Sequence, residues 1–346
     1  IMVENSVKQE IVMVFLVKFV LVVILTEKNQ LKLRKHNMKI LGIGNAIVDV
    51  ICKVDDNFIT HNELTKGTMK LFFDESEFKN LLINLKIEKT ISGGSVANSV
   101  VGISQLGCKA GFIGKISDDE FGIKYEEGLK KENVKYFYSK KKEKLPTGTC
   151  LILVTPDSER TMCTFLGTAG KINENDVDFD AINQSELIFL EGYLWDEGEP
   201  KKAFDKAIKS AKKVAMSLSD KFCVDRHKTH FLDLVKNKLD IIFANEQEIT
   251  SLIDAQSFNE VINFSKKLNK LLVVTRGEKG AIAIQGDQVF ECGIKSNLKI
   301  VDLTGAGDLF AAGFLYGHVS NFSIGESLEK GTEMSSKIIQ QIGARL

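Results

Sequence analysis

VDLTGAGDLFAAGFLY, residues 301–316, is the most informative segment of this 346-residue chain. We expect a strand to end near Val301, after which the Gly-Ala-Gly sequence at 305–307 lets the backbone turn tightly into an apolar helix. Small residues at a helix N-terminus leave backbone N–H groups uncovered, and the helix dipole favours a negative charge there. Asp308 falls in the first turn of this helix, where simple capping is the alternative role. The segment therefore predicts an anion-binding turn at the carboxyl end of a strand.

Short apolar runs alternate with helical patterns through most of the chain. Strands are expected at residues 39–54, with an interruption at Gly42-Ile43-Gly44-Asn45, and at 110–113, 187–190, 213–218, 241–244 and 271–275. Helices are expected at 96–106, 120–131, 201–212, 227–236, 246–253 and 258–268. The alternation predicts an α/β fold with a mainly parallel sheet covered by helices on both faces. Ligands of such sheets bind at the carboxyl ends of strands, so the loops after the strands should carry the site.

Two segments interrupt this alternation. Residues 55–73 and 134–166 are rich in β-forming residues and turn signals and show no helical period. We expect them to form a small β lid beside the α/β body, with residues 38–346 acting as one unit.

The first 37 residues differ from the rest. Residues 11–25 are apolar apart from Lys18, a length that suits a signal peptide better than a membrane span. No small-residue cleavage site follows, and Met38 directly precedes the first expected strand. We therefore expect the natural protein to begin at Met38, and residues 1–37 to be a non-native or disordered extension.

The overall composition excludes several classes of partner. Lys and Arg together number 46, as do Asp and Glu, so the formal net charge is zero. Such a chain has no global positive field to hold nucleic acid or an anionic membrane, and we expect neither partner. The six cysteines form no CxxC pair, which argues against a zinc site or a disulfide framework and favours a reducing, cytoplasmic location.

Two separate motifs resemble one enzyme family. The sequence LTGAGD at 303–308, preceded by Asp302, closely resembles the C-terminal signature of the ribokinase-like (PfkB) carbohydrate kinases, which usually have Thr where Leu303 stands. The sequence GGSVAN at 93–98 resembles their N-terminal signature, and the two motifs stand in the family's order. The resemblance covers residues 38–346. It implies a three-layer α/β/α body with a β lid, and transfer of a phosphoryl group from ATP, with Mg²⁺, to the hydroxymethyl group of a sugar or nucleoside.

The resemblance also assigns catalytic roles. Asp308 is the candidate base that accepts the proton of the attacking hydroxymethyl group, a role worth roughly 10² to 10⁴ in rate. The N–H groups of Gly305, Ala306 and Gly307 are expected to form an anion hole for the transferring phosphoryl group. Arg160, in the expected lid, aligns with an arginine that reaches the phosphates in adenosine-kinase relatives; a solvated hairpin arginine is the alternative.

Two further motifs are assigned to the nucleotide. Asn245 and Glu248 match the family's Asn-x-x-Glu motif and are expected to organise the phosphates and Mg²⁺, Glu248 through water. An ordinary helix start is the alternative, because Asn caps helices and Glu favours the third position. The turn at 275–280 resembles the family's nucleotide-side turn, and its candidate residues are Thr275, Gly277 and Gly280. The resemblance also suggests a monovalent-cation site near residues 300–304.

The acceptor site is assigned to the first expected strand and the first signature. In similar kinases the positions of Asn45, Asp49, Gly93, Gly94 and Asn98 hold the sugar hydroxyls. A carboxylate and amides suit a vicinal diol, because they accept and donate hydrogen bonds with geometric selectivity.

Adenosine-kinase-like members look most similar within the family. The supporting sequences are GNAIVD at 44–49, PTGTC at 146–150, EGYLW at 191–195 and DRH at 225–227. Adenosine, ribose, fructose-type and ketodeoxy sugars nevertheless stay open as acceptors, and both a monomer and a homodimer stay open as assemblies.

Two other functions compete with the kinase interpretation. A dinucleotide-binding oxidoreductase is prompted by Gly42-Ile43-Gly44, but the third glycine of that motif would fall at Ile47 and a strand, not a helix, follows. A catalytically silent sugar-binding regulator on the same fold would be expected to lose Asp308 or the 305–307 turn. Both are intact in this chain.

Overall fold

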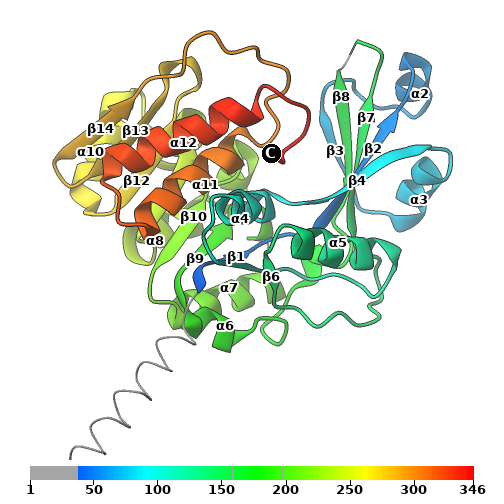
Figure 1. Cartoon of the computed structure of the whole chain (residues 1–346), viewed down its shortest axis with the longest axis horizontal. Coiled ribbons are helices and arrows are strands. Elements are labelled where there is room, and N and C mark those ends of the chain that lie inside the picture. Colours follow the sequence, from blue (N-terminus) through cyan, green and yellow to red (C-terminus); the bar gives the residue numbers. More distant parts are fainter. Residues whose placement is uncertain (1–37, 158, 196–197) are drawn as a thin grey trace, which may run out of the picture. The chain divides into compact units, whose positions relative to one another are not determined.

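A computed structural model describes residues 38–157, 159–195 and 198–346 (Figure 1). Within them, the main sheet has the strand order β14-β13-β12-β11-β10-β9-β1-β5-β6. The strands are Met38–Ile43 (β1), Ala110–Ile113 (β5), Lys135–Tyr136 (β6), Ser185–Glu191 (β9), Val214–Ser217 (β10), Ile241–Asn245 (β11), Leu271–Thr275 (β12), Ala281–Gln285 (β13) and Gln288–Cys292 (β14). Strands β9 to β12 pair in parallel, as do β1, β5 and β6, whereas β12, β13 and β14 pair antiparallel. The expected mainly parallel sheet is confirmed.

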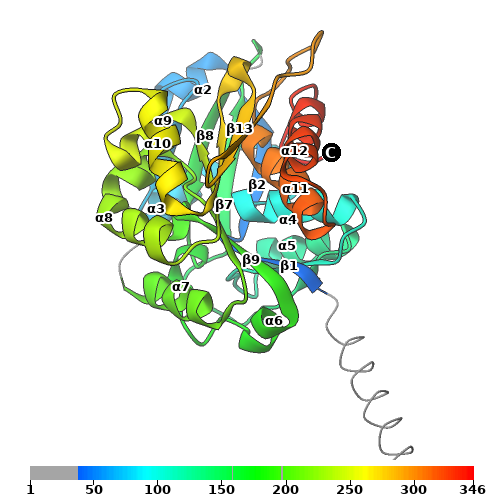
Figure 2. The same ribbon diagram turned by 90° about the vertical axis from the view of Figure 1, so that its left-hand side faces the viewer.

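Helices cover both faces of this sheet. In Figure 2, α4, α11 and α12 lie on one side of the strands, and α8, α9 and α10 lie on the other. The helices of the body are Ser95–Gln105 (α4), Glu120–Lys131 (α5), Phe179–Gln184 (α6), Glu199–Ser210 (α7), Lys221–Asn237 (α8), Glu246–Ile253 (α9), Phe258–Leu268 (α10), Ala306–Val319 (α11) and Ile324–Ile338 (α12). Because both faces are covered, a strand such as β12 is buried almost continuously from Leu271 to Val274. The three-layer α/β/α body is confirmed.

A second, smaller sheet stands beside the body. Its strand order is β3-β8-β7-β2-β4, and its strands are Ile47–Lys53 (β2), Met69–Phe72 (β3), Ile87–Gly93 (β4), Gly148–Val154 (β7) and Arg160–Phe165 (β8). Two short helices, Asp56–His61 (α2) and Glu75–Ile83 (α3), accompany it (Figure 1). The Phe78 ring of α3 stacks on Phe165 of β8 with centroids 5.6 Å apart. One face of the small sheet is therefore packed against helices.

The details of the small sheet differ from the sequence prediction in two ways. Residues 55–73 show no helical period, yet the helix α2 lies within them. Asp55 accepts a hydrogen bond from the Phe58 N–H and so begins this helix, which is too short to show a helical period. In addition, β2 and β4 belong to the small sheet although they lie outside 55–73 and 134–166, while β6 lies within 134–166 and joins the main sheet.

The strand expected at 39–54 is divided between the two sheets. It breaks after Ile43 into β1 of the main sheet and β2 of the small sheet. Gly44, Asn45 and Ala46 form the connection, and all three are buried. This crossing brings the first residues of β2 to the carboxyl end of the main sheet, where the site was expected.

The extension expected at residues 1–37 lies outside the described residues. Within the described ranges, no helix combines the length and the apolar composition needed to cross a membrane.

Candidate functional site

A cavity of about 610 Å³ lies between the carboxyl ends of the main-sheet strands and one face of the small sheet. The predicted site residues that line it are Asn45, Asp49, Gly94, Asn98, Asn245, Glu248, Thr275, Gly305, Ala306, Gly307 and Asp308. Its lining does not include Gly93, Arg160, Gly277 or Gly280. The structure thus gathers residues from segments that are far apart in the sequence, between Asn45 and Asp308.

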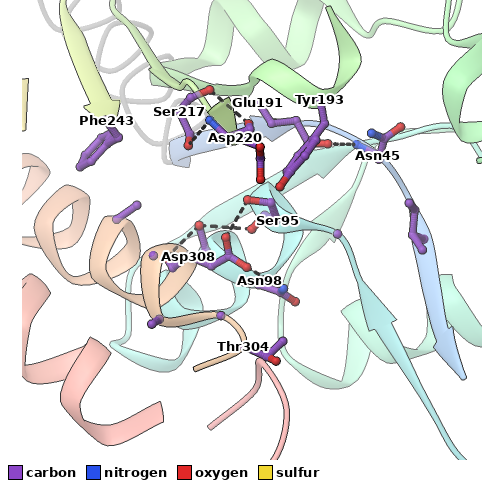
Figure 3. A pocket seen from close by; sticks show the side chains of 18 of the residues that line it. Asn45, Ser95, Asn98, Glu191, Tyr193, Ser217, Asp220, Phe243, Thr304 and Asp308 are labelled. Carbon is purple, nitrogen blue, oxygen red and sulfur yellow. Dashed lines mark hydrogen bonds between the residues drawn. The ribbon is translucent and has the colours of Figure 1, made fainter. Parts of the chain in front are cut away.

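Asp308 lies in the first turn of α11 and faces the N-terminal turn of α4 (Figure 3). Its Oδ1 accepts a hydrogen bond from the Ser95 hydroxyl at 2.6 Å, and its Oδ2 accepts one from the Asn98 amide at 2.8 Å. Burial raises the pKa of Asp308, and these two hydrogen bonds oppose that rise because they favour the ionised form. A fixed carboxylate with a raised pKa is well suited to accept a proton.

The 305–307 turn precedes Asp308 and begins a helix of 14 residues. The Ala306 N–H donates to the Leu303 carbonyl at 3.1 Å, so in this conformation it is engaged within the turn. For the N–H groups of Gly305 and Gly307, no acceptor is found in the described part of the chain. Both residues line the cavity, so these two donors and the helix dipole are suited to an anion beside Asp308.

The acceptor candidates Asn45, Asp49 and Asn98 line the same cavity as Asp308. The Oδ1 atoms of Asn45 and Asn98 are buried, and neither has a hydrogen-bond partner among the described residues. Buried acceptors without a partner are unusual in folded proteins, which marks both as positions for ligand hydroxyl groups. Asp49 lies against Gly93, where an added Cβ would be 2.2 Å from Asp49 Oδ2. Burial raises the pKa of Asp49 to about 7.

Glu191, at the end of β9, is a site residue that the sequence analysis missed. Its Oε1 accepts the Asn45 N–H at 2.8 Å (Figure 3). Its Oε2 accepts the Val96 N–H at 3.0 Å. The carboxylate thereby joins the β1–β2 crossing to the N-terminus of α4. Burial raises its pKa to about 7. The EGYLW sequence at 191–195 indicates only a resemblance to adenosine-kinase-like members, and no local pattern reveals that Glu191 faces the cavity.

The nucleotide candidates lie at the ends of neighbouring strands. Asn245 of β11 and Thr275 of β12 are paired in register, and both line the cavity. Asn245 and Glu248 form a capping box, in which each side chain accepts the other's backbone N–H. The motif therefore does form an ordinary helix start, and both residues also line the cavity.

The acidic pair Asp220 and Glu248 lines the same part of the cavity. Asp220, which caps α8, was not among the predicted site residues. Burial raises the pKa of Glu248 to about 7, and the Asp220 charge adds to the rise. Within the described ranges, no group of three or more His, Cys, Asp or Glu side chains could enclose a metal. One or two carboxylates beside phosphates fit Mg²⁺, because this ion retains much of its water and is held largely by the nucleotide.

The remaining nucleotide candidates lie away from the cavity. Gly277 and Gly280 belong to the turn between the antiparallel strands β12 and β13. Gly280 has a positive φ of 82°, and a Cβ there would lie 2.1 Å from the Cys292 carbonyl. Its requirement for glycine therefore has a local structural cause.

Arg160 also lies outside the cavity lining. Its guanidinium donates to Asp302 Oδ2 and, at 3.4 Å, to the Thr304 hydroxyl. In this structure the arginine thus joins β8 of the small sheet to the loop that leads into the 305–307 turn.

The cavity-facing side of the small sheet is mainly apolar. Alternate residues of its strands point toward the cavity, as the twofold period of a strand requires. The lining side chains from these strands and the loop after β8 are Ile47, Asp49, Met69, Leu71, Cys150, Ile152, Met162, Thr164 and Leu166. Asp49 is the one ionisable carboxylate on this face among the described residues.

The sequence profile of the pfkB family carbohydrate kinases matches residues 47–346. The chain belongs to this family. It is accordingly a kinase of the sugar and nucleoside class, and the oxidoreductase alternative is excluded. Membership of the family implies that ATP is the phosphoryl donor.

Relatives of this kinase include both nucleoside and sugar kinases. A crystal structure of adenosine kinase from Sinorhizobium meliloti is 35% identical and superimposes with a TM-score of 0.81, covering 90% of this chain and 96% of that one. A probable sugar kinase from Rhizobium etli is also 35% identical with a TM-score of 0.81, covering 90% and 95%. A 5-dehydro-2-deoxygluconokinase from Clostridium botulinum is 27% identical, covering 79% of this chain and 85% of the relative. The family is thus established, while the relatives differ in their acceptors.

Proposed function

We propose that this kinase phosphorylates the hydroxymethyl group of a nucleoside of the adenosine type, using ATP and Mg²⁺. The observation that carries the proposal is the division of the cavity into a polar end and an apolar wall. Asn45, Asn98 and Asp49 offer hydrogen-bond acceptors at the polar end. The small sheet forms the apolar wall with side chains such as Ile152 and Met162. A ribose bound to the polar groups would leave the flat, largely apolar base against this wall, where thioether and aliphatic groups adapt to its faces.

Simple sugars and sugar acids suit the cavity less well. Hydroxyl groups of ribose or fructose facing the wall would lose water without gaining a partner, which costs free energy. A ketodeoxygluconate would bring a carboxylate, and among the described lining residues Arg226 of α8 is the one cationic side chain. Its guanidinium lies over the Phe222 ring, 5.6 Å from the centroid, on the helix that Asp220 caps. This location favours the nucleotide side rather than the acceptor side.

The proposed chemistry requires positioning and charge neutralisation rather than a covalent intermediate. Asp308 accepts the proton of the hydroxymethyl group as the hydroxymethyl oxygen attacks the γ-phosphorus of ATP, and the bond from this phosphorus to the β-phosphate oxygen breaks, so that ADP leaves. Ser95 and Asn98 hold the Asp308 carboxylate in place. The N–H groups of Gly305 and Gly307 stabilise the charge on the transferring group. Mg²⁺, held beside Glu248 and Asp220, would neutralise charge on the phosphates.

ADP release from ATP and Mg²⁺ tests the proposal against adenosine, other nucleosides, ribose, fructose and ketodeoxygluconate. We expect kcat/KM for adenosine to exceed that for each sugar by at least about tenfold, since the base supplies contacts that the sugars lack. Preference for a sugar would refute the nucleoside assignment while leaving the family chemistry intact. ATP binding without turnover of any acceptor would favour the silent regulator.

A further inference from the structure

The segment that follows α12 contacts the loop and turn of the anion-binding position. The Gly343 N–H donates to Asp302 Oδ2 at 2.8 Å, in the loop that leads into the 305–307 turn. Ala344 packs on the turn itself: a Cβ added to Gly305 would lie 2.6 Å from the Ala344 Cβ. Gly305 also has a positive φ of 77°, so residue 305 satisfies both a backbone and a packing requirement.

The next residue of this segment, Arg345, contacts the β4–α4 junction, whose Gly94 lines the cavity. Its guanidinium donates to the Ala97 carbonyl at 3.1 Å and to the Ser92 carbonyl. Ser92 lies in β4 and Ala97 in α4, so the two carbonyls stand on either side of the Gly93-Gly94 junction. A planar guanidinium with donors in a fixed fork can hold two carbonyls at once, which a lysine ammonium does less well.

The charge of Arg345 acts on both functional aspartates. Burial raises the pKa of Asp49 and of Asp308, and the Arg345 charge opposes the rise in each case. Asp308 in turn adds to the rise at Asp49, because two like charges in one cavity disfavour each other. Arg345 thus offsets a repulsion that the paired carboxylates create.

We propose that Arg345 is a positioning residue for phosphoryl transfer, holding the β4–α4 junction against the anion-binding turn and supplying the countercharge for Asp49 and Asp308. This inference rests on the proposed function, since it assumes that both carboxylates act ionised. It gives the segment 343–345, which the sequence analysis does not single out, a role in the reaction.

Other charged and titratable groups surround Arg345. Arg345 also lines a second cavity, of about 580 Å³, and another lining residue of this cavity supplies a matched control. The groups that face it or act on its charge are Asp49 of β2, Lys89 of β4, Lys124, Tyr125, Glu127 and Lys131 of α5, Glu132 after α5, and Asp308 of α11. Lys131 carries the same charge as Arg345 and lines the second cavity, but it does not act on the pKa of Asp49 or Asp308.

Three variants of the full chain separate the effect of the Arg345 charge from that of its hydrogen bonds to the Ser92 and Ala97 carbonyls. Arg345→Gln removes the charge and retains an amide donor, Arg345→Lys retains the charge and loses the fork, and Lys131→Gln is the matched control. For each, kcat/KM for the acceptor that wild type turns over is measured between pH 5 and 9. The acceptor's Kd is measured without ATP over the same range, and thermal unfolding verifies the fold.

We expect Arg345→Gln to move the acid limb, the low-pH fall in the pH profile of kcat/KM, to higher pH by about one unit. The reason is that losing a nearby positive charge disfavours the ionised carboxylates of Asp49 and Asp308. Its acceptor Kd should rise most at low pH. Arg345→Lys should keep the wild-type limb but raise the acceptor Kd by about threefold or more, since the hydrogen bonds to the junction are lost. Lys131→Gln should match wild type in both measurements.

The inference would be overturned if Arg345→Gln kept the acid limb of the kcat/KM profile and the acceptor Kd of the wild type. It would also be overturned if Lys131→Gln moved the acid limb as far as Arg345→Gln does. If Arg345→Gln does not fold, the Lys variant decides: a limb displaced by one unit despite the retained charge contradicts the inference. Failure of the wild type to turn over any acceptor would refute the proposed function, and the inference with it. Wild-type turnover with unchanged Arg345 variants would refute the inference alone.

Discussion

Ser95 and Asp308 are 213 positions apart in the sequence, and the Ser95 hydroxyl donates a 2.6 Å hydrogen bond to the Asp308 carboxylate. The bond joins the first turn of α4 to the first turn of α11, so the two signature motifs of the family meet at one carboxylate (Figure 3). Asn98, from the same turn of α4, completes the arrangement. The proposed base is therefore held by the motif that is assigned to the acceptor.

Replacing Asp308 by Asn should lower kcat by at least about a hundredfold, because the amide cannot accept the hydroxymethyl proton. ATP binding and thermal stability should stay near wild type. Ser95→Ala is the matched control: it should cost less than tenfold in kcat and move the acid limb to higher pH, because the Ser95 bond opposes the rise in the pKa of Asp308. Normal turnover by Asp308→Asn would exclude Asp308 as the base.

Replacing Asp49 by Ala should raise the KM of the acceptor by about tenfold or more, since a hydrogen bond to a charged group is lost at the acceptor site. The KM of ATP should change by less than about twofold. Asp49 lies on the small sheet, whereas the proposed position of ATP is at the ends of β11 and β12 in the main sheet. Initial rates with each substrate varied in turn measure both constants. Equal increases in the two would remove Asp49 from the acceptor site.

Replacing Ile152 by Ala should raise the KM of adenosine by about tenfold, because aliphatic surface opposite the base is removed. The KM of ATP should stay near wild type. Val154→Ala is the matched control, since Val154 lies on the same face of β7 but does not line the cavity. Unchanged adenosine kinetics in Ile152→Ala would contradict the placement of the base against the small sheet.

Glu191 should make stability depend on pH. Its pKa rises from 4.5 to about 7 on folding, so between these values the folded state holds a proton that the unfolded state has released. The free energy of unfolding therefore falls as pH rises through this window, by up to about 3 kcal/mol from this group. In Glu191→Gln this part of the pH dependence should disappear. Urea unfolding at pH 5 and pH 8 measures it, and parallel profiles for the two proteins would show that Glu191 does not titrate as stated.

Local patterns were sufficient for most of the body. The strands at 110–113 and 271–275 and the helices at 120–131, 246–253 and 258–268 have the bounds that the sequence predicts. These elements have clear periods and caps, such as Asp119 before α5 and Asn245 before α9. The two signatures likewise identified the family, because glycine and acidic residues at fixed spacing reflect local backbone requirements.

Local patterns do not predict which distant segments pair with one another. The interruption at 42–45 was visible, but that β1 and β2 enter different sheets depends on which strands they pair with. Gly277 and Gly280 match a motif, yet the β12–β13 hairpin places them outside the cavity. A motif fixes a local conformation, whereas its direction relative to a cavity depends on the packing of the whole sheet.

The sequence alone thus fixes the family, the layered fold and the identity of Asp308 as the acid residue to test. Glu191 and Arg345 gain their significance only from the folded chain, because each contacts backbone groups that other elements supply. Side chains that bond to distant backbone leave no periodic signal, since the partner N–H or carbonyl is common to almost every residue. Sequence motifs reflect local backbone geometry, whereas tertiary packing determines which segment each buried charged side chain contacts.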